Sequence, residues 1–205
     1  MLILGLTGSI GMGKSTAAEY LRSKGIGVFD ADGEVHKLYA GFAVPLIEAA
    51  FPGTTANGAV NRAALSAALG SSAEKFRRLE ALVHPLVRAA ERAFLLAEHA
   101  RHAKLAVLDI PLLFETGAST LVDVTLVVST DAATQRARVL ARPGMTAAKL
   151  DAMASRQMSD ADKRARADFI VDTGGLITDT QAQIDAVLSQ LDGRSETAFG
   201  RDWEA

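Results

Sequence analysis

The feature that most constrains this chain is a glycine-rich segment directly after its first apolar run. Residues 2–7 (LILGLT) form a short, almost continuously apolar stretch, as is typical of a strand buried on both faces of a parallel sheet. They lead into GSIGMGKS at residues 8–15, and residues 15–24 then show helical periodicity. A strand, a glycine loop and a helix in this order indicate the start of an α/β fold.

The octapeptide matches the Walker A pattern of phosphate-binding loops. Its glycines let backbone N–H groups turn inward around phosphate oxygens, and the following helix presents its positive end to them. Lys14 adds a charge for the β- and γ-phosphates, and Ser15 is placed to ligate Mg²⁺. A chance glycine-rich turn is the alternative, but the flanking strand and helix argue against it. We predict that ATP binds to Gly11, Met12, Gly13, Lys14, Ser15 and Thr16.

Four further strands and a closing helix are predicted along the chain. The strands are residues 26–30, 104–110, 122–128 and 169–172, which completes a five-stranded parallel sheet in a three-layer core. Residues 178–191 form an amphipathic helix with a Thr/Asp cap, and the polar tail after Asp192 is expected to fray.

Two helical inserts interrupt this core, at residues 33–103 and 130–167. The first contains turn signals such as Asn57-Gly58 and two helices, residues 74–83 and 86–99, with Pro85 at the start of the second. The nucleotide-binding core is therefore residues 1–32, 104–129 and 168–205. The second insert is basic, with Arg136, Arg138, Arg142, Lys149, Arg156, Lys163, Arg164 and Arg166.

The remaining motifs favour a small-molecule kinase. A GTPase needs a base-reading NKxD motif, which is absent, and the third strand runs into DIPL rather than a DxxG switch. A basic helical insert suits a mobile lid, because phosphoryl transfer requires the γ-phosphate to be shielded from water and its charge neutralised.

An acceptor hydroxyl also needs a group that takes its proton. Asp30-Ala31-Asp32 follows the second strand, at the sheet edge where ligands of open α/β folds bind. We predict Asp32 as the general base. Its alternative role is only to cap a helix over residues 33–39.

Several motifs together resemble the dephospho-coenzyme A kinase family, with spacing intact over nearly the whole chain. They are LTGSIGMGKST at residues 6–16, Asp30-Ala31-Asp32, His84-Pro85, DIPLLFE at residues 109–115 and Ala167-Asp168. The DIPLLFE segment discriminates most, since Walker A loops occur in many unrelated enzymes. This resemblance implies phosphorylation of the ribose 3′-hydroxyl of dephospho-coenzyme A by ATP, the last step of coenzyme A biosynthesis.

The resemblance also assigns roles to individual positions. It implies that residues 33–103 form an acceptor domain and residues 130–167 a lid. Asp32 falls on the proposed base, and Arg138 and Arg142 fall on lid arginines that join Lys14 in catalysis. Arg62, His84, Leu112, Phe114 and Glu115 fall on the acceptor side, together with Asp32.

Each of these positions has a plainer alternative, and one departs from the family. His84 could cap a helix or fill a packed corner, Arg62 could be a solvated charge, and residues 112–114 could be core. Where the family often has asparagines near the adenine, this chain has DTGG at residues 172–175. A nucleoside, nucleotide or sugar kinase is the alternative enzyme, and a regulatory NTP-binding switch is the alternative outside small-molecule kinases.

Composition limits the partners and the location. The net charge is -2, so no polycationic surface for nucleic acid is expected, and the absence of cysteine excludes disulfides and thiol catalysis. The apolar start lacks a basic n-region, and no uncharged apolar run approaches the ~18 residues of a membrane span. We expect a cytoplasmic protein without membrane attachment, and nothing requires more than a monomer.

Overall fold

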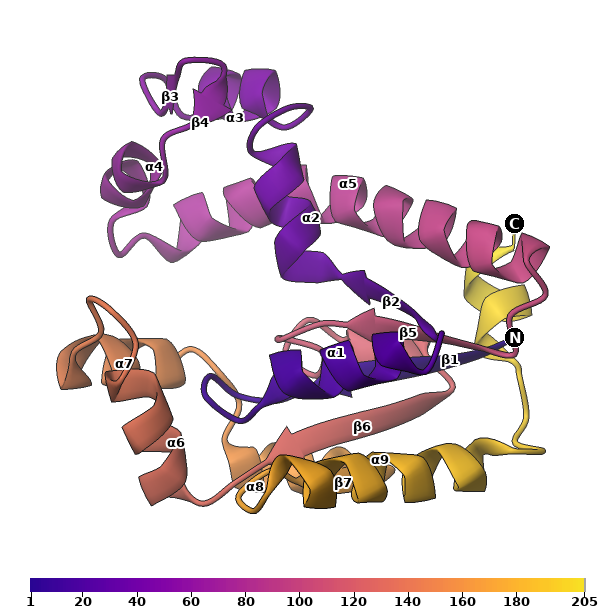
Figure 1. Cartoon of the computed structure of the whole chain (residues 1–205). Helices are drawn as coiled ribbons and strands as arrows, with labels where there is room; N and C mark the ends of the chain where they lie inside the picture. Colours follow the sequence, from indigo (N-terminus) through magenta and orange to yellow (C-terminus); the bar gives the residue numbers. More distant parts are fainter. Residues whose placement is uncertain (205) are drawn as a thin grey trace. The chain divides into compact units, whose positions relative to one another are not determined.

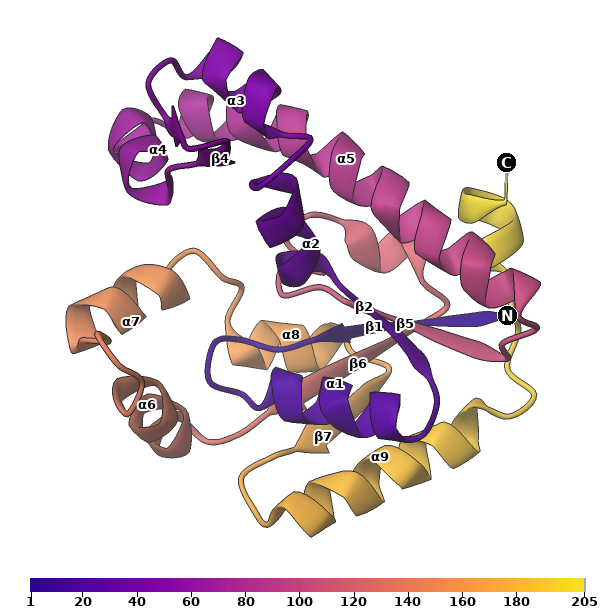
Figure 2. The same cartoon turned by 45° about the horizontal axis from the view of Figure 1, so that its top comes forward.

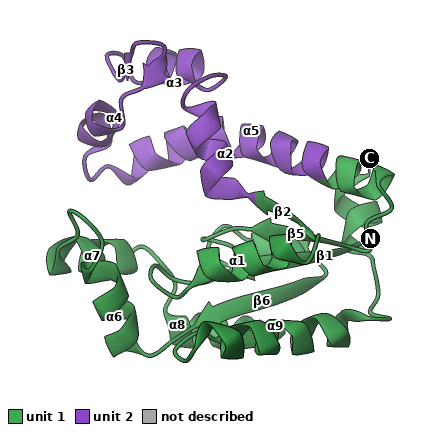
Figure 3. Ribbon diagram, in the orientation of Figure 1, with its two compact units in different colours: residues 1–29, 95–205 green, residues 30–94 purple. Residues whose placement is uncertain are grey.

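The computed structural model describes residues 1–204, which divide into two compact units. The first is made of residues 1–29 and 95–205, and the second of residues 30–94 (Figure 3). The predicted insert at residues 33–103 thus contains nearly all of the second unit, whereas the basic insert is grouped with the core. The assignment of an acceptor domain and a lid stays a prediction.

The first unit is built on a parallel sheet of five strands, as predicted (Figures 1 and 2). Its order is β2-β5-β1-β6-β7, so the strand before the glycine loop lies at the centre. The strands are β1 (Leu2–Thr7), β2 (Gly27–Asp30), β5 (Leu105–Asp109), β6 (Val124–Ser129) and β7 (Phe169–Asp172).

Burial on both faces explains why β1 is almost entirely apolar. All six of its residues are buried, and Leu2, Leu4 and Leu6 pack with α1 (Lys14–Ser23) and α9 (Ile177–Leu191) on one face. On the other face a β-carbon at Gly5 would lie 2.9 Å from a methyl group of Leu113. Thr7 is therefore the only polar side chain of this strand, and its hydroxyl donates to Pro111 O, while a side chain at position 5 would displace Leu113.

Four further helices of this unit come from the basic insert and from the loop after β5. They are η1 (Ala118–Leu121), α6 (Ala132–Leu140), α7 (Ala147–Ala154) and α8 (Asp160–Arg166). Side chains cap the last three: Asp131 accepts from Thr134 N, Thr146 from Lys149 N and Ser159 from Asp162 N. These caps agree with the predicted helical character of residues 130–167.

The second unit contains short elements around a core of its own. These elements are α2 (Ala31–Leu38), α3 (Val44–Ala50), β3 (Thr55–Ala56), β4 (Ala59–Val60) and α4 (Arg62–Leu69), with the first part of α5 (Ala73–Ala100). Asn57 and Gly58 both have positive φ, at 52° and 76°, and join β3 to β4. The turn was predicted, but the two short strands on either side of it were not.

Helix α5 corrects one prediction. Residues 74–83 and 86–99 were expected as two helices, whereas they form one helix of 28 residues with Pro85 inside it. Proline removes one backbone donor and crowds the carbonyl four residues earlier. The buried residues Val83 and Leu95 lie on the two sides of this interruption, so packing along the helix offsets its cost.

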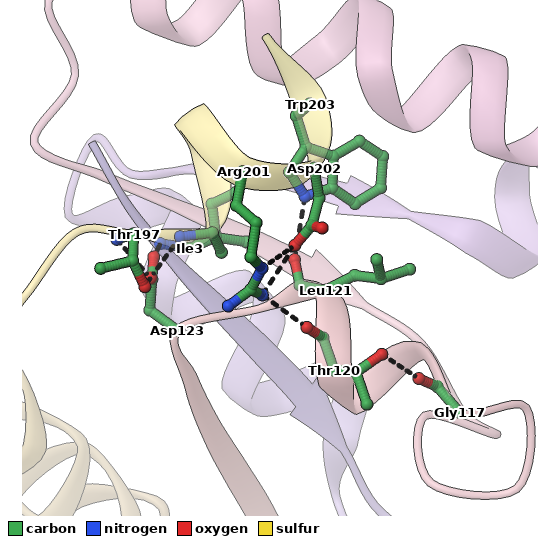
Figure 4. A network of polar contacts seen from close by, with 10 residues as sticks. Ile3, Gly117, Thr120, Leu121, Asp123, Thr197, Arg201, Asp202 and Trp203 are labelled. Carbon is green, nitrogen blue, oxygen red and sulfur yellow. Dashed lines mark hydrogen bonds and ion pairs between the residues drawn. The ribbon is translucent and has the colours of Figure 1, made fainter. Parts of the chain in front are cut away.

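The tail after α9 corrects a second prediction, since it is folded rather than frayed. Residues 199–203 form the short π-helix η2, and Trp203 is only 1% exposed. Figure 4 shows the polar contacts that hold it: Trp203 Nε1 donates to Leu121 O at 2.9 Å, and Arg201 donates to Thr120 O. Burial of the Trp203 ring removes a large apolar area from water and so stabilises a tail whose composition is otherwise polar.

Asp123 is the acceptor on which this tail converges. One carboxylate oxygen accepts from Thr197 N at 2.8 Å, Ala198 N at 2.7 Å and the Thr197 hydroxyl, and the other accepts from Ile3 N at 2.8 Å. The carboxylate therefore joins the start of the central strand to the tail (Figure 4).

We predict that Asp123→Ala releases the tail and destabilises the first unit. Three backbone donors lose their acceptor, so the free energy of unfolding should fall by at least about 2 kcal/mol. Trp203 is the only tryptophan, so its fluorescence emission should shift to longer wavelength in native buffer. Asp192→Ala, at an exposed carboxylate, is the control, and an unshifted emission spectrum for Asp123→Ala would contradict the prediction.

Candidate active site

The glycine loop connects the end of β1 to the start of α1. Gly11 and Gly13 have φ values of 80° and 85°. Met12 N donates to Ser9 O at 3.1 Å and closes the turn formed by residues 9–12. Only glycine adopts this left-handed conformation without strain. The loop therefore ends with Gly13 directly before Lys14, the first residue of α1.

Three distant segments pack so tightly on the loop that its glycines are needed for space as well. A β-carbon on Gly8 would lie 2.5 Å from Val128 Cγ2, and one on Gly11 would lie 2.5 Å from Val139 Cγ2. One on Gly13 would lie 3.0 Å from Thr173 Oγ1. Strand β6, helix α6 and the segment after β7 thus shape the loop from outside.

The charge of Lys14 is held at the end of the neighbouring strand. Its Nζ donates to Asp109 Oδ1 at 2.5 Å, and Asp109 is 4% exposed at the carboxyl end of β5. Ser15 and Thr16, in the first turn of α1, are exposed. The six predicted ATP-binding residues are contiguous here, with their N–H groups at a helix start, where anions are stabilised.

The two predicted lid arginines differ in their contacts. Arg138, on α6, donates to Thr173 Oγ1 at 3.1 Å and to Thr173 O at 2.6 Å. Thr173 itself donates to Met12 O at 2.9 Å, so Arg138 reaches the loop through a single residue. Arg142 is exposed, and within the described part of the chain nothing pairs with its guanidinium.

The segment after β5 contains both core and exposed side chains. Leu113 is fully buried and Phe114 is 9% exposed, whereas Leu112 is 38% exposed. Leu113 therefore fills the core, which is the alternative to substrate contact given above for residues 112–114. Of the predicted acceptor-side residues in this segment, Leu112 is the one with a large exposed apolar surface.

Glu115 is already engaged by the basic insert. Its Oε1 accepts from Lys163 Nζ at 3.0 Å and from Met158 N at 2.8 Å. Lys163 is completely buried and also donates to Pro111 O at 3.0 Å. The ion pair therefore anchors the start of α8 to the segment after β5, a role that the sequence did not indicate for either residue.

Asp32 belongs to the second unit, in the first turn of α2. The cap of this helix is Asp30, whose side chain accepts from Gly33 N at 3.0 Å. The proposal that Asp32 is only a cap is therefore wrong, because the helix begins one residue before it. Asp32 is exposed, and among residues 1–204 no group donates to its carboxylate.

Arg62 and His84 also lie in the second unit. The Arg62 guanidinium lies over the Tyr39 ring, 5.5 Å from its centroid, and Asn61 caps α4 beside it. Burial raises the pKa of Tyr39, and the Arg62 charge lowers it in part. His84 is exposed in the middle of α5, so it caps no helix and fills no packed corner.

Sequence reasoning missed several polar residues near these positions. Burial raises the pKa of Glu91, two turns after His84, to about 6, although Arg88 lies 3.0 Å away. Gln135 and Gln157 contact the glycine loop, and nothing in the sequence pattern distinguishes these glutamines from solvated ones.

Metal sites and membrane-spanning helices each have a pattern with which the described residues can be compared. Among the described residues no three His, Asp or Glu side chains are grouped to hold a metal ion. Over residues 1–204, none of the helices combines the length and the apolar character needed to cross a bilayer.

The fold and the site together define a P-loop kinase: a parallel α/β core, a glycine loop before a helix, and a lysine beside a buried strand-end carboxylate. The family model for dephospho-CoA kinase matches residues 2–179. This chain therefore belongs to the dephospho-CoA kinase family, which confirms the resemblance seen in the motifs.

Individual relatives agree with this assignment. Dephospho-CoA kinase from Mesorhizobium japonicum is 52% identical over 194 residues, which cover 95% of this chain and 98% of that protein. A crystal structure from Thermus thermophilus has a TM-score of 0.81 at 36% identity, covering 94% of this chain and 98% of the other. Dephospho-CoA kinase from Campylobacter jejuni shares the fold, with a TM-score of 0.60, 23% identity, and 92% and 96% coverage.

The buried ion pair generates a stability prediction. Lys163→Met should lower the free energy of unfolding by about 3–5 kcal/mol, because it leaves the Glu115 carboxylate without its counter-charge. Adding Glu115→Gln should recover part of the loss, since the charge is then removed as well. Urea unfolding measures both, with the exposed Lys104→Met as control. A loss no larger than that of the control would contradict the prediction.

Proposed function

We propose that this enzyme transfers the γ-phosphoryl group of ATP to the ribose 3′-hydroxyl of dephospho-coenzyme A, giving coenzyme A and ADP. The match of residues 2–179 to the dephospho-CoA kinase family carries this conclusion and agrees with the function predicted from the motifs. The reaction is the final step of coenzyme A biosynthesis.

On the donor side, the proposal uses the loop and the lysine. The positive end of α1 and the loop N–H groups bind the phosphates, while Lys14 neutralises charge that develops on the transferred group. Asp109 Oδ1 lies 2.5 Å from the Lys14 ammonium group. The phosphate oxygens of ATP would therefore compete with the Asp109 carboxylate for the Lys14 ammonium group.

Mg²⁺ fits the residues that are present, with Ser15 as its protein ligand. The Ser15 side chain is exposed in the first turn of α1, and no cluster of carboxylates is grouped as a metal cage among the described residues. A magnesium ion held mainly by phosphates and water needs few protein ligands. When bound, it supplies neutralisation of the phosphate charge.

On the acceptor side, we propose Asp32 as the group that takes the hydroxyl proton. Its support is that Asp30 performs the capping, so the Asp32 carboxylate is exposed and unpaired within the described residues. Arg62, His84, Leu112, Phe114 and Glu115 remain proposed substrate contacts. Glu115 would act chiefly by placing its segment, because Lys163 and Met158 N already occupy one of its oxygens.

For the lid, the guanidinium of Arg142 has no partner among the described residues, whereas Arg138 must exchange its two bonds to Thr173 before it contacts a phosphate. Both stay proposed catalytic groups.

We also infer a cytoplasmic monomer without nucleic-acid or membrane partners, in keeping with a net charge of -2.

The decisive assay measures ADP release with Mg-ATP and dephospho-coenzyme A. We expect rapid turnover with this acceptor and slow ATP hydrolysis without it, because an enzyme of this class should close only over its acceptor. Adenosine, simple nucleotides and sugars serve as comparison acceptors. Turnover on one of these with no coenzyme A formed would overturn the proposal.

Asp32→Asn tests the proposed base. Turnover should fall by roughly two to four orders of magnitude while ATP affinity is kept, as for loss of a positioned base. Glu34→Gln, which removes another carboxylate from the first turn of α2, is the matched control. Equal turnover for Asp32→Asn and the control would leave Asp32 a positioning group at most.

A further inference from the structure

Two glutamines from the basic insert contact a single residue of the glycine loop. Gln157 Oε1 accepts from Ile10 N at 3.1 Å, and Gln135 Nε2 donates to Ile10 O at 2.8 Å. Gln135 lies on α6, and Gln157 lies between α7 and α8. Both backbone groups of Ile10 are thus bonded to side chains far away in the sequence, Gln135 at a separation of 125 positions and Gln157 at a separation of 147.

These two bonds orient successive peptide groups of the loop. The N–H of Ile10 belongs to the peptide that joins Ser9 to Ile10, and its carbonyl belongs to the peptide that joins Ile10 to Gly11. A peptide group is planar and trans, so its N–H and C=O point in opposite directions. Because Gln135 binds the Ile10 carbonyl, the N–H of Gly11 must point away from α6.

Peptide orientation matters in this segment more than elsewhere in the chain. The loop binds phosphate through backbone N–H groups, and Gly11 at φ 80° has the conformational freedom to reorient them. Val139 restricts Gly11 from one side, since a β-carbon there would lie 2.5 Å from its Cγ2. The glutamines add directional bonds to this steric restriction.

We propose that Gln135 and Gln157 are positioning residues for the phosphate loop. They set the direction of its peptide groups before nucleotide binds, and they make the basic insert part of the nucleotide site. The inference rests on the proposed function for its kinetic consequences. Neither side chain needs to touch ATP, because each acts through the Ile10 backbone.

An effect of the two glutamines on the loop can be told apart from an effect on stability, because other contacts also hold the basic insert to the core. Lys163 and Met158 N bind Glu115, and Asp160 accepts from the Ser129 hydroxyl at 2.8 Å. Loss of either glutamine bond should therefore leave the nucleotide-free protein folded and nearly as stable.

The test replaces each glutamine by methionine, which keeps the side-chain length and removes the amide. Gln190→Met, at an exposed position on α9, is the matched control. Relative to it, Gln135→Met and Gln157→Met should each lower kcat/KM for ATP by about 3- to 10-fold, the equivalent of one net hydrogen bond. The KM for dephospho-coenzyme A and the melting temperature without nucleotide should match the control.

Calorimetric titration with ATP alone supplies a readout that does not depend on the acceptor. Its Kd should weaken by a similar factor in both variants. An ATP Kd within twofold of the Gln190→Met value, or a melting temperature that falls together with kcat/KM, would overturn the inference. Wild-type protein that binds ATP without phosphorylating dephospho-coenzyme A would instead overturn the proposed function, and the titration would still decide the role of the glutamines.

Discussion

The close approach of the glycine loop to its surroundings is the constraint on which the rest of the first unit depends. Gly8, Gly11 and Gly13 each meet a side chain of a different distant segment: a β-carbon would clash at Gly8 and Gly11, and at Gly13 it would force Thr173 to shift. The shape of the loop therefore depends on β6, α6 and the segment after β7. The conformation of the octapeptide is in this sense a property of the whole unit.

Polar anchors with several partners keep those segments in place. Asp123 joins the central strand to the C-terminal tail, and Lys163 joins α8 to the segment after β5. Thr173 joins Arg138 to Met12. Buried polar groups are costly unless all their partners are present, so each anchor favours one arrangement of its segments over slightly shifted ones. The same property makes the anchors sensitive points for mutation.

Much of the fold could be predicted because its signals are local. The apolar run of β1, the glycine pattern and the helical periodicity after it need only neighbouring residues, and the five strands were recognised in the same way. The errors lie where packing overrides a local signal. The local pattern predicts a helix start at Pro85, but a buried face continues on both sides of it. The tail was expected to fray, yet Trp203 and Asp123 hold it folded.

By itself, the sequence determined the class of fold and the family, because these are encoded in local apolar patterns and in short motifs of neighbouring residues. Only the tertiary structure decided how individual polar side chains are used. It assigned the helix cap to Asp30 rather than Asp32, paired Glu115 with Lys163, and brought Gln135 and Gln157 to the Ile10 backbone. Such pairings join residues far apart in the chain, and a lone glutamine or lysine has no local pattern that reveals its partner.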